Sequence, residues 1–195
     1  MAKLVIVCGL PGAGKTTLAN ELSKALKIFC LHKDSVKESL YDSLKMNSLE
    51  DSKTLGYPSV KTILDLAEEN ISRGVDVIIE SPFHFENDRE IFMVLKSKYS
   101  IEIHTIVLEL EATERKKRFA ERERHHSHHD TERGVQYEEV ASTYEHMPEP
   151  KLFLDSKNTL EEENYNLKIY LKDKNLEEDY QNFTRKLEHN FEFER

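Results

Sequence analysis

The chain has 195 residues, and its 28 Lys and Arg residues against 37 Asp and Glu residues give a formal net charge of −9. A chain of this length forms about one domain, and its hydrophobic share of 38% is enough for a core, so a disordered chain is excluded. The acidic balance gives no general attraction for nucleic acid or anionic membranes, and no apolar stretch approaches the ~20 residues that span a bilayer.

Short apolar runs alternate along the chain with segments of helical periodicity. This alternation predicts repeated strand–helix units, and therefore an α/β fold with a largely parallel sheet covered by helices on both faces. In the first half of the chain, strands and helices are expected in turn at residues 4–8, 14–26, 28–31, 35–44, 60–73 and 75–80. Ser35 and Glu38 form the S-x-x-E signature of a helix start. Residues 46–58 lack clean periodicity, so a loop or small insert is expected there.

The second half of the chain continues this pattern with one change of composition. A helix and a strand are expected at 87–98 and 101–110, and the highly charged residues 113–124 then predict a helix with almost no apolar face. The remaining expected elements are a helix at 135–147, a fifth strand at 152–154, and helices at 159–171 and 176–187. The stretch NLKIYL within the first of these two helices could instead form an edge strand. We expect one domain over residues 1–172, with a lid at about 113–134, and a C-terminal helical extension over 173–195.

The first motif that carries chemistry is GLPGAGKT at residues 9–16, which fits the phosphate-binding pattern GxxxxGK[ST]. Glycines let backbone amides curl around phosphate oxygens, and the helix that follows offers its positive N-terminal end. The motif follows an apolar strand and opens an amphipathic helix, as such a loop requires, and a plain glycine turn is the alternative. The residues expected to bind the phosphates are Gly9, Leu10, Pro11, Gly12, Ala13, Gly14, Lys15, Thr16 and Thr17. Lys15 would reach the β- and γ-phosphates, and the Thr16 hydroxyl would bind Mg²⁺.

Two carboxylates follow neighbouring strands and are candidates for the same edge of the sheet. Asp34 comes after the second strand, where it could accept a proton from an attacking hydroxyl or hold a water molecule on Mg²⁺. Glu80 ends the run VDVIIE, and this position resembles that of a Walker B carboxylate that binds a Mg²⁺ water or orients the nucleophile. The alternatives are that Asp34 only caps a helix and that Glu80 is only a solvated strand-end residue. The functional roles given to Asp34 and Glu80 could also be exchanged.

The charged segment 113–124 places Arg115, Arg118 and Arg122 on one side of a helix. Arginines that fold over a nucleotide can neutralise the charge that spreads over the γ-phosphate in phosphoryl transfer, although a solvated face with ion pairs is the alternative. A cluster of four histidines follows, namely His125, His126, His128 and His129. Adjacent histidines on an exposed segment are a poor zinc site, so we expect phosphate-contacting or solvated lid residues. His32 and His84 lie at or beyond strand ends and could line an acceptor pocket or belong to its rim or to the core.

The motifs taken together resemble P-loop kinases of the small-molecule and polynucleotide type, a group that includes gluconate kinase, chloramphenicol phosphotransferase, zeta toxin and polynucleotide 5′-kinase. The resemblance rests on GLPGAGKTTLA, LHKDSVKESLYD, RGVDVIIESPF and ERKKRFAERERHH, and it covers about residues 3–172. It implies a three-layer P-loop NTPase fold with a mostly parallel five-stranded sheet, a helical lid and an extra C-terminal helix. It also implies that residues of the phosphate loop bind ATP and Mg²⁺, that Asp34 contacts or deprotonates the acceptor hydroxyl, and that Arg118 and Arg122 are lid arginines. No guanine-recognition motif of the NKxD type is present, so a GTPase is not expected.

The expected function is transfer of the γ-phosphoryl group of ATP, with Mg²⁺, to a hydroxyl of a small molecule. Lys15, Asp34, Arg118 and Arg122 are the expected catalytic residues, and Thr16, Asp34 and Glu80 the expected Mg²⁺ ligands. The net charge of −9 disfavours a polynucleotide 5′-kinase, but this alternative stays open. An ATP-responsive binding protein without transfer chemistry is a second open alternative. Cys8 and Cys30 lie in apolar runs and are expected to be free thiols, which fits a cytoplasmic location.

Overall fold

The computed structural model describes residues 1–121, 123–129 and 144–156, which form a five-stranded sheet in the order β2-β3-β1-β4-β5. All four neighbouring pairs are parallel, as the alternation of strands and helices predicts. The strands are β1 (Lys3–Gly9), β2 (Phe29–His32), β3 (Val77–Glu80), β4 (Glu102–Glu109) and β5 (Lys151–Asp155). Each lies within three residues of its expected position, because a parallel strand that is buried on both faces is a nearly continuous apolar run.

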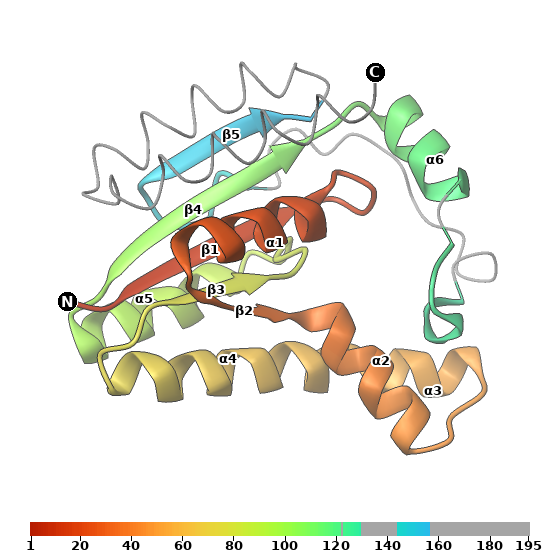
Figure 1. Cartoon of the computed structure of the whole chain (residues 1–195), viewed down its shortest axis with the longest axis horizontal. Coiled ribbons are helices and arrows are strands. Elements are labelled where there is room, and N and C mark those ends of the chain that lie inside the picture. Colours follow the sequence, from red (N-terminus) through yellow and green to blue (C-terminus); the bar gives the residue numbers. More distant parts are fainter. Residues whose placement is uncertain (122, 130–143, 157–195) are drawn as a thin grey trace.

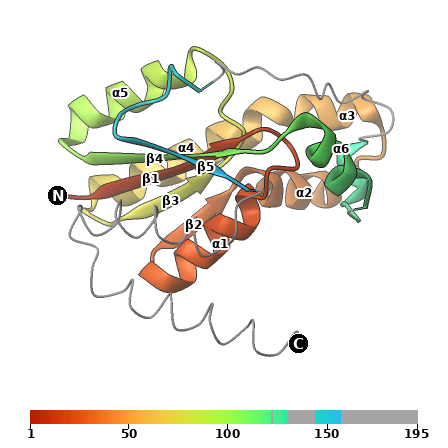
Figure 2. The ribbon, with the colours of Figure 1, turned by 90° about the horizontal axis from the view of Figure 1, so that it is seen from above.

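The helices lie on both sides of this sheet and complete the expected three layers (Figure 2). They are α1 (Lys15–Leu26), α2 (Lys33–Ser43), α3 (Leu49–Thr54), α4 (Gly56–Ser72), α5 (Asp88–Tyr99) and α6 (Ala112–Glu121), followed by a 3₁₀ turn, η1 (His126–His128). None of the described helices is long and apolar enough to cross a membrane.

The core consists of two apolar layers, because successive side chains of a strand point to opposite faces. Leu4, Ile6 and Cys8 of β1 pack in one layer with residues of α4 and α5. Val5 and Val7 pack in the other layer with residues of α1. The sheet is therefore held rigidly between helices, and the loops at its carboxyl edge start from fixed positions.

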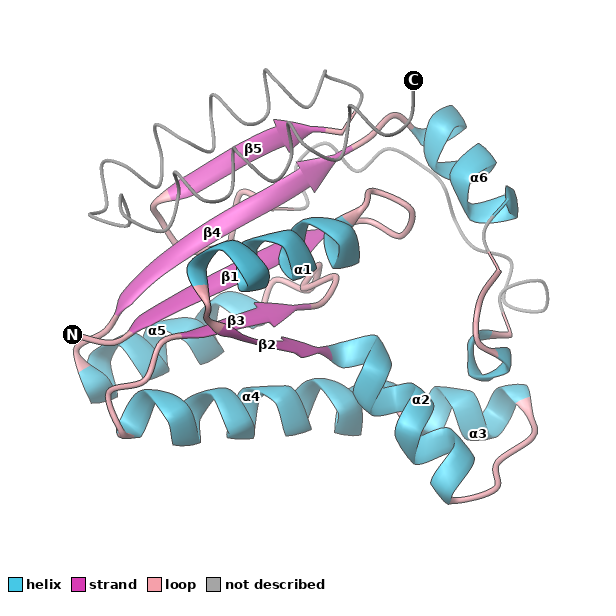
Figure 3. Cartoon of the chain, viewed as in Figure 1, coloured by secondary structure: helices cyan, strands magenta, loops and turns pink. Residues whose placement is uncertain are grey.

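Three helices gather at the end of the molecule toward which the strands point. Figure 1 shows α2, α3 and α6 beyond the arrowheads of the sheet, and Figure 3 shows that α2 continues directly from β2, while loops join α2 to α3 and β4 to α6. The same end holds the phosphate loop after β1, the start of α2 after β2 and the end of β3. In open α/β sheets, ligands bind at this edge.

The structure corrects two expectations about helices. Residues 46–58, expected to form a loop or small insert, are not a loop, because they contain α3 and the start of α4. Ser48 and Asp51 form a reciprocal capping box at the start of α3, with distances of 3.1 and 3.2 Å. Pro58 lies in the first turn of α4, where its missing N–H removes no helical hydrogen bond. In addition, α2 begins at Lys33 rather than at Ser35, so Asp34 belongs to its first turn.

Several expected features lie outside the described residues. These are Arg122, most of the helix expected at 135–147, the segments expected at 159–171 and 176–187, and the boundary between 172 and 173. The end of the helix expected at 135–147 is described, and residues 144–147 form a turn there instead of a helix. Both cysteines are free thiols, as expected, with Cys8 buried and Cys30 half-buried.

Candidate active site

The phosphate loop depends on glycines at the points where it passes close to other backbone. Gly9, Gly12 and Gly14 have positive φ angles of 142°, 85° and 93°, which residues with a Cβ rarely adopt. A Cβ on Gly9 would lie 2.4 Å from the carbonyl oxygen of Leu108 in β4, and one on Gly12 would lie 3.0 Å from that of Arg115 in α6. Glycines are therefore required at these positions, because β4 and α6 approach the loop closely.

Lys15 is the first residue of α1, and its side chain lies back along the phosphate loop. The residue is 8% exposed, and its Nζ donates to the Leu10 carbonyl oxygen at 3.1 Å. Burial lowers the pKa of Lys15, while the charges of Glu80 and Asp34 act in the opposite direction. No side-chain hydrogen bond caps α1 at Gly14, so the positive end of the helix faces the loop together with the ammonium group. This arrangement suits a phosphate anion.

Glu80 connects the phosphate loop with the end of β2. The Thr16 hydroxyl donates to Glu80 Oε2 at 3.3 Å, and His32 Nδ1 lies 3.1 Å from the same oxygen. Hydrogen bonds with the side chains of Cys30 and Glu80 raise the pKa of His32 to about 10. His32 is therefore a cation that holds a buried carboxylate beside the hydroxyl of Thr16. A hydroxyl and a carboxylate oxygen are ligands that Mg²⁺ prefers, so the pair fits the ion.

Asp34 is held between two cations from different parts of the chain. Lys33 Nζ lies 2.9 Å from Asp34 Oδ1, and Arg124 Nη2 lies 3.2 Å from Oδ2. Burial raises the pKa of Asp34, but the charge and the hydrogen bond of Lys33, together with the charge of Arg124, outweigh it and bring the pKa well below its ordinary value. The carboxylate is therefore ionised throughout the physiological range, and its position is fixed from both sides.

The contact with Arg124 belongs to a larger pairing between α2 and the turn after α6. Asp34, Glu38 and Asp42 are spaced four residues apart, so they form one acidic face of α2. His128 Nε2 lies 2.8 Å from Glu38 Oε1 and its Nδ1 lies 2.9 Å from Arg124 Nη2. Each acidic group of this face is thus paired with a basic group of the turn, although the order of the partners along the turn differs from the order along the helix.

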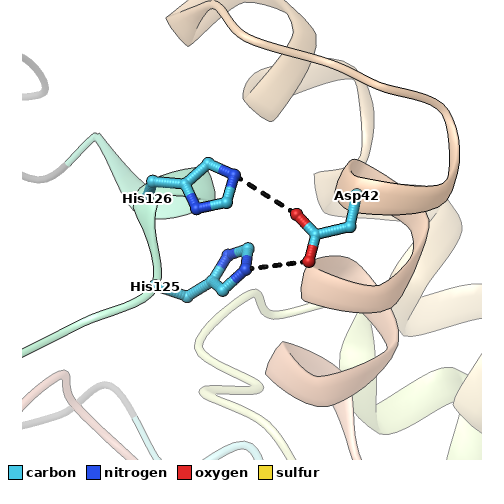
Figure 4. A group of neighbouring side chains, drawn as sticks. All are labelled: Asp42, His125 and His126. Atoms are coloured by element: carbon cyan, nitrogen blue, oxygen red, sulfur yellow. Dashed lines mark hydrogen bonds and ion pairs between the residues drawn. The ribbon is translucent and has the colours of Figure 1, made fainter.

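The far end of this pairing contains a carboxylate between two imidazoles (Figure 4). Nε2 of His125 and Nε2 of His126 each lie 3.2 Å from an oxygen of Asp42, and the three ligand atoms lie within 4.8 Å of one another. His125 Nδ1 accepts the backbone N–H of Ser127 at 3.2 Å, which leaves the proton of a neutral ring on Nε2. A protonated Nε2 donates to Asp42 and does not ligate a metal ion. The group is therefore explained by hydrogen bonds, and the expectation that these histidines belong to the lid stays a prediction.

The arginines of α6 lie differently from one another. Arg115 is 2% exposed, and its Nε donates to the Leu110 carbonyl oxygen at 2.8 Å. Its side chain is therefore buried and does not face an open site, while its backbone lies against Gly12 of the phosphate loop. Arg118 Nη2 donates to the carbonyl oxygen of Ser156 at 3.1 Å, and Ser156 Oγ donates to that of Ala13 at 2.6 Å. Arg118 thus reaches the phosphate loop through the residue that follows β5.

Comparisons with known proteins agree with this geometry. The family model AAA_33, described as an AAA domain, matches residues 4–145. The chain belongs to the AAA_33 family. AAA_33 domains are of the P-loop kinase type, so the expected resemblance is confirmed. No curated protein matches the chain.

Three solved structures share the fold of this AAA_33 domain. A candidate kinase from Chloroflexus aurantiacus is 23% identical, with a TM-score of 0.64 over 83% of this chain and 90% of its own. A sugar kinase from Janibacter is 18% identical, with a TM-score of 0.56 over 88% and 95% of the two chains. The APS kinase of Mycobacterium tuberculosis, solved with AMPPNP and APS, is 16% identical, with a TM-score of 0.56 over 96% and 98%. At these identities the likeness establishes the α/β P-loop fold.

The AAA_33 domain brings together most of the residues singled out from the sequence. Lys15, Thr16, Asp34 and Glu80 lie at one edge of the sheet. Sequence reasoning did not select Arg124 for the site, although it belongs to the same basic run as Arg118 and Arg122. It named His32 and His128 for other positions but not as partners of carboxylates, and it gave Lys33 and Glu38 no part in the site. The one available signal was the four-residue spacing of acidic side chains on α2 opposite a cluster of histidines.

Proposed function

We propose that this AAA_33 domain transfers the γ-phosphoryl group of ATP to a hydroxyl of a small molecule. The observation that carries the proposal is the position of Lys15, whose ammonium group lies in the phosphate loop and within the electrostatic reach of both Glu80 and Asp34. A nucleotide-binding loop alone would need no second carboxylate. A phosphotransferase needs one group for the metal ion and another for the acceptor.

The phosphate loop and Glu80 would bind different parts of the nucleotide and its metal ion. Backbone amides of the loop and Lys15 Nζ would bind the β- and γ-phosphates, and Thr16 and Glu80 would hold Mg²⁺. When bound, Mg²⁺ would neutralise charge that develops on the phosphate oxygens. The contact with His32 holds the Glu80 carboxylate beside the hydroxyl of Thr16.

Asp34 would receive the hydroxyl of the acceptor as a hydrogen-bond partner. Its pKa lies below the ordinary value, so it is a weak base and orients the oxygen rather than removing its proton early. This suits a loose transition state, in which the nucleophile keeps its proton until late. Lys33 and Arg124 hold the carboxylate in place for this role.

The charge of the molecule favours a small acceptor over a polynucleotide. Oligonucleotide binding draws on a groove of free cations, whereas the basic groups of the turn at 124–128 are paired with the acidic face of α2. The net charge of −9 acts in the same direction.

The test is ATP consumption, measured with Mg²⁺ against a panel of alcohols, sugars, nucleosides and 5′-hydroxyl oligonucleotides. We expect transfer to one class of small alcohol, and the Lys15→Ala variant should lose at least about 100-fold in turnover. Lys24→Ala is the matched control, because Lys24 is an exposed residue of the same helix, paired with Glu21. Near-normal transfer in Lys15→Ala would refute the assignment of the loop. Transfer to oligonucleotides alone would favour a polynucleotide kinase. ATP binding without any transfer would favour an ATP-responsive binding protein.

A further inference from the structure

A cavity of about 630 Å³ opens between α4, α5 and the segment that follows β3. This volume is in the range of sites that bind small organic molecules. Residues from Tyr57 to Glu68 of α4 line it, which corresponds to about 16 Å along the helix axis. The cavity is therefore an elongated groove rather than a compact phosphate-sized pocket.

The walls of this cavity are mainly apolar. The apolar side chains that line it include Tyr57, Val60, Leu64, Phe85, Ile91 and Leu95. Tyr57 is 73% exposed and Phe85 is 66% exposed. Large apolar groups that stay in contact with water beside a cavity mark a binding site for an apolar partner.

The charged groups of the cavity are compensated within the protein. Lys61 pairs with Asp65, and Glu68 pairs with Lys98 and accepts from the Tyr99 hydroxyl. Asp88 Oδ2 accepts the backbone N–H of Phe85 at 3.0 Å. Lys61, Asp65 and Glu68 therefore offer a charged ligand no unbalanced partner, and the Asp88 carboxylate already accepts a backbone N–H. A polyol would leave many hydroxyls facing hydrocarbon, which is unfavourable.

One end of the cavity meets the proposed active site. Lys33 lines the cavity and donates to Asp34 Oδ1 at 2.9 Å. Ser81, which also lines it, directly follows Glu80. His84 is another lining residue, and the charge of Lys15 acts on it. A molecule seated along α4 can therefore present one end to Asp34.

Resting on the phosphotransferase function above, we propose that the acceptor is an uncharged alcohol with an apolar, ring-containing body. The body lies in the groove beside α4, and the hydroxyl points to Asp34. The hydroxyl oxygen forms a bond to the γ-phosphorus while the bond from that phosphorus to the β–γ bridging oxygen breaks. The products are ADP, a phosphate monoester and a proton, which passes by way of Asp34 to water.

The experiment uses 2-(2-naphthyl)ethanol, an uncharged aromatic alcohol, as the probe of the cavity. The chain has no Trp, so naphthyl emission can be followed without tryptophan interference. We expect saturable binding to the full chain. The double variant Tyr57→Ser, Phe85→Ser should weaken it about tenfold and leave the affinity for ATP unchanged. Phe29→Ser is the matched control, because Phe29 is 62% exposed on β2, away from the cavity.

The outcomes separate this proposal from the function on which it rests. Absence of saturable binding, or equal weakening in Phe29→Ser, overturns the proposal about the acceptor. Faster transfer to gluconate or myo-inositol than to any apolar alcohol also overturns it, while the phosphotransferase function stands. Saturable binding of the probe to a chain that does not bind ATP refutes the phosphotransferase function and leaves an apolar binding site.

Discussion

Gly9 is the residue at which β1 ends and the phosphate loop begins, and it is paired in register with Leu108 of β4. Its φ of 142° and the close carbonyl oxygen of Leu108 leave no room for a side chain. We expect Gly9→Ala to lower the free energy of unfolding by about 1–3 kcal/mol and to weaken ATP binding, as measured by thermal melting and calorimetry.

Gly56 provides the control for this prediction. It lies at the start of α4, its φ is not positive, and a Cβ there would meet nothing within 4 Å. Gly56→Ala should therefore leave stability unchanged or raise it by up to about 1 kcal/mol, because alanine loses less conformational freedom on folding. Equal destabilisation by the two substitutions would contradict the role given to Gly9.

Asp34 permits a test that separates chemistry from nucleotide binding. In Asp34→Asn the side chain keeps its shape but loses its charge, so it can no longer bind the acceptor hydroxyl as an anion. We expect transfer to fall by about 10²–10⁴-fold while the affinity for ATP changes little. Single-turnover transfer and ATP titration measure the two quantities, and an unchanged rate of transfer would remove Asp34 from the mechanism.

At the scale of elements, the contact between α2 and the turn at 124–128 holds the segment that we expect to act as a lid. His128 is part of this contact and faces Glu38, Arg124, Asp34 and Lys37. Burial lowers the pKa of His128, and the charge of Asp34 and the hydrogen bond with Glu38 oppose this without reversing it. The docked turn therefore holds His128 in its neutral form more strongly than the undocked turn does.

This difference predicts a pH dependence of lid docking. Because the docked pKa lies below the ordinary value of 6.5, the stabilisation is present above that value and is lost as the pH falls through it toward the docked pKa. Between pH 7.5 and 5.5 we expect faster hydrogen exchange at residues 123–129. His128→Gln removes this titration but leaves His125 and His126 in place. A pH dependence that is the same in this variant would show that His128 is not its source.

Local patterns could be predicted from the sequence, whereas distant contacts could not. The strands and the loop around Lys15 follow from short apolar runs and one motif, and the structure confirms the strands. The short α3 was missed because its capping box uses Asp51 in place of the usual Glu or Gln. The pairing of Arg124 with Asp34 joins residues that are 90 positions apart. Such a contact depends on how the lid packs, and no local pattern encodes it.

The whole molecule places its phosphate loop, its two carboxylates and its groove at one edge of a rigid sheet. A ligand that binds this folded edge and not the unfolded chain stabilises the fold by mass action. ATP with Mg²⁺ at about 100 times its Kd should therefore add about 2.7 kcal/mol to the free energy of unfolding. Thermal melting measures this, and Lys15→Ala should abolish the shift. An equal shift with Lys15→Ala would place the nucleotide elsewhere.

Two contacts attach α6, the helix of the expected lid, to the phosphate loop. Arg115 backbone lies against Gly12, and Arg118 is joined to Ala13 through Ser156. The turn that follows this helix in sequence bonds to Asp34, where the acceptor would be received. From these contacts we expect a shift of the loop around phosphate to move α6 and the turn that contacts Asp34. Thermodynamic reciprocity then applies to the two binding affinities. If bound nucleotide raises the affinity for the acceptor by some factor, bound acceptor raises the affinity for nucleotide by the same factor.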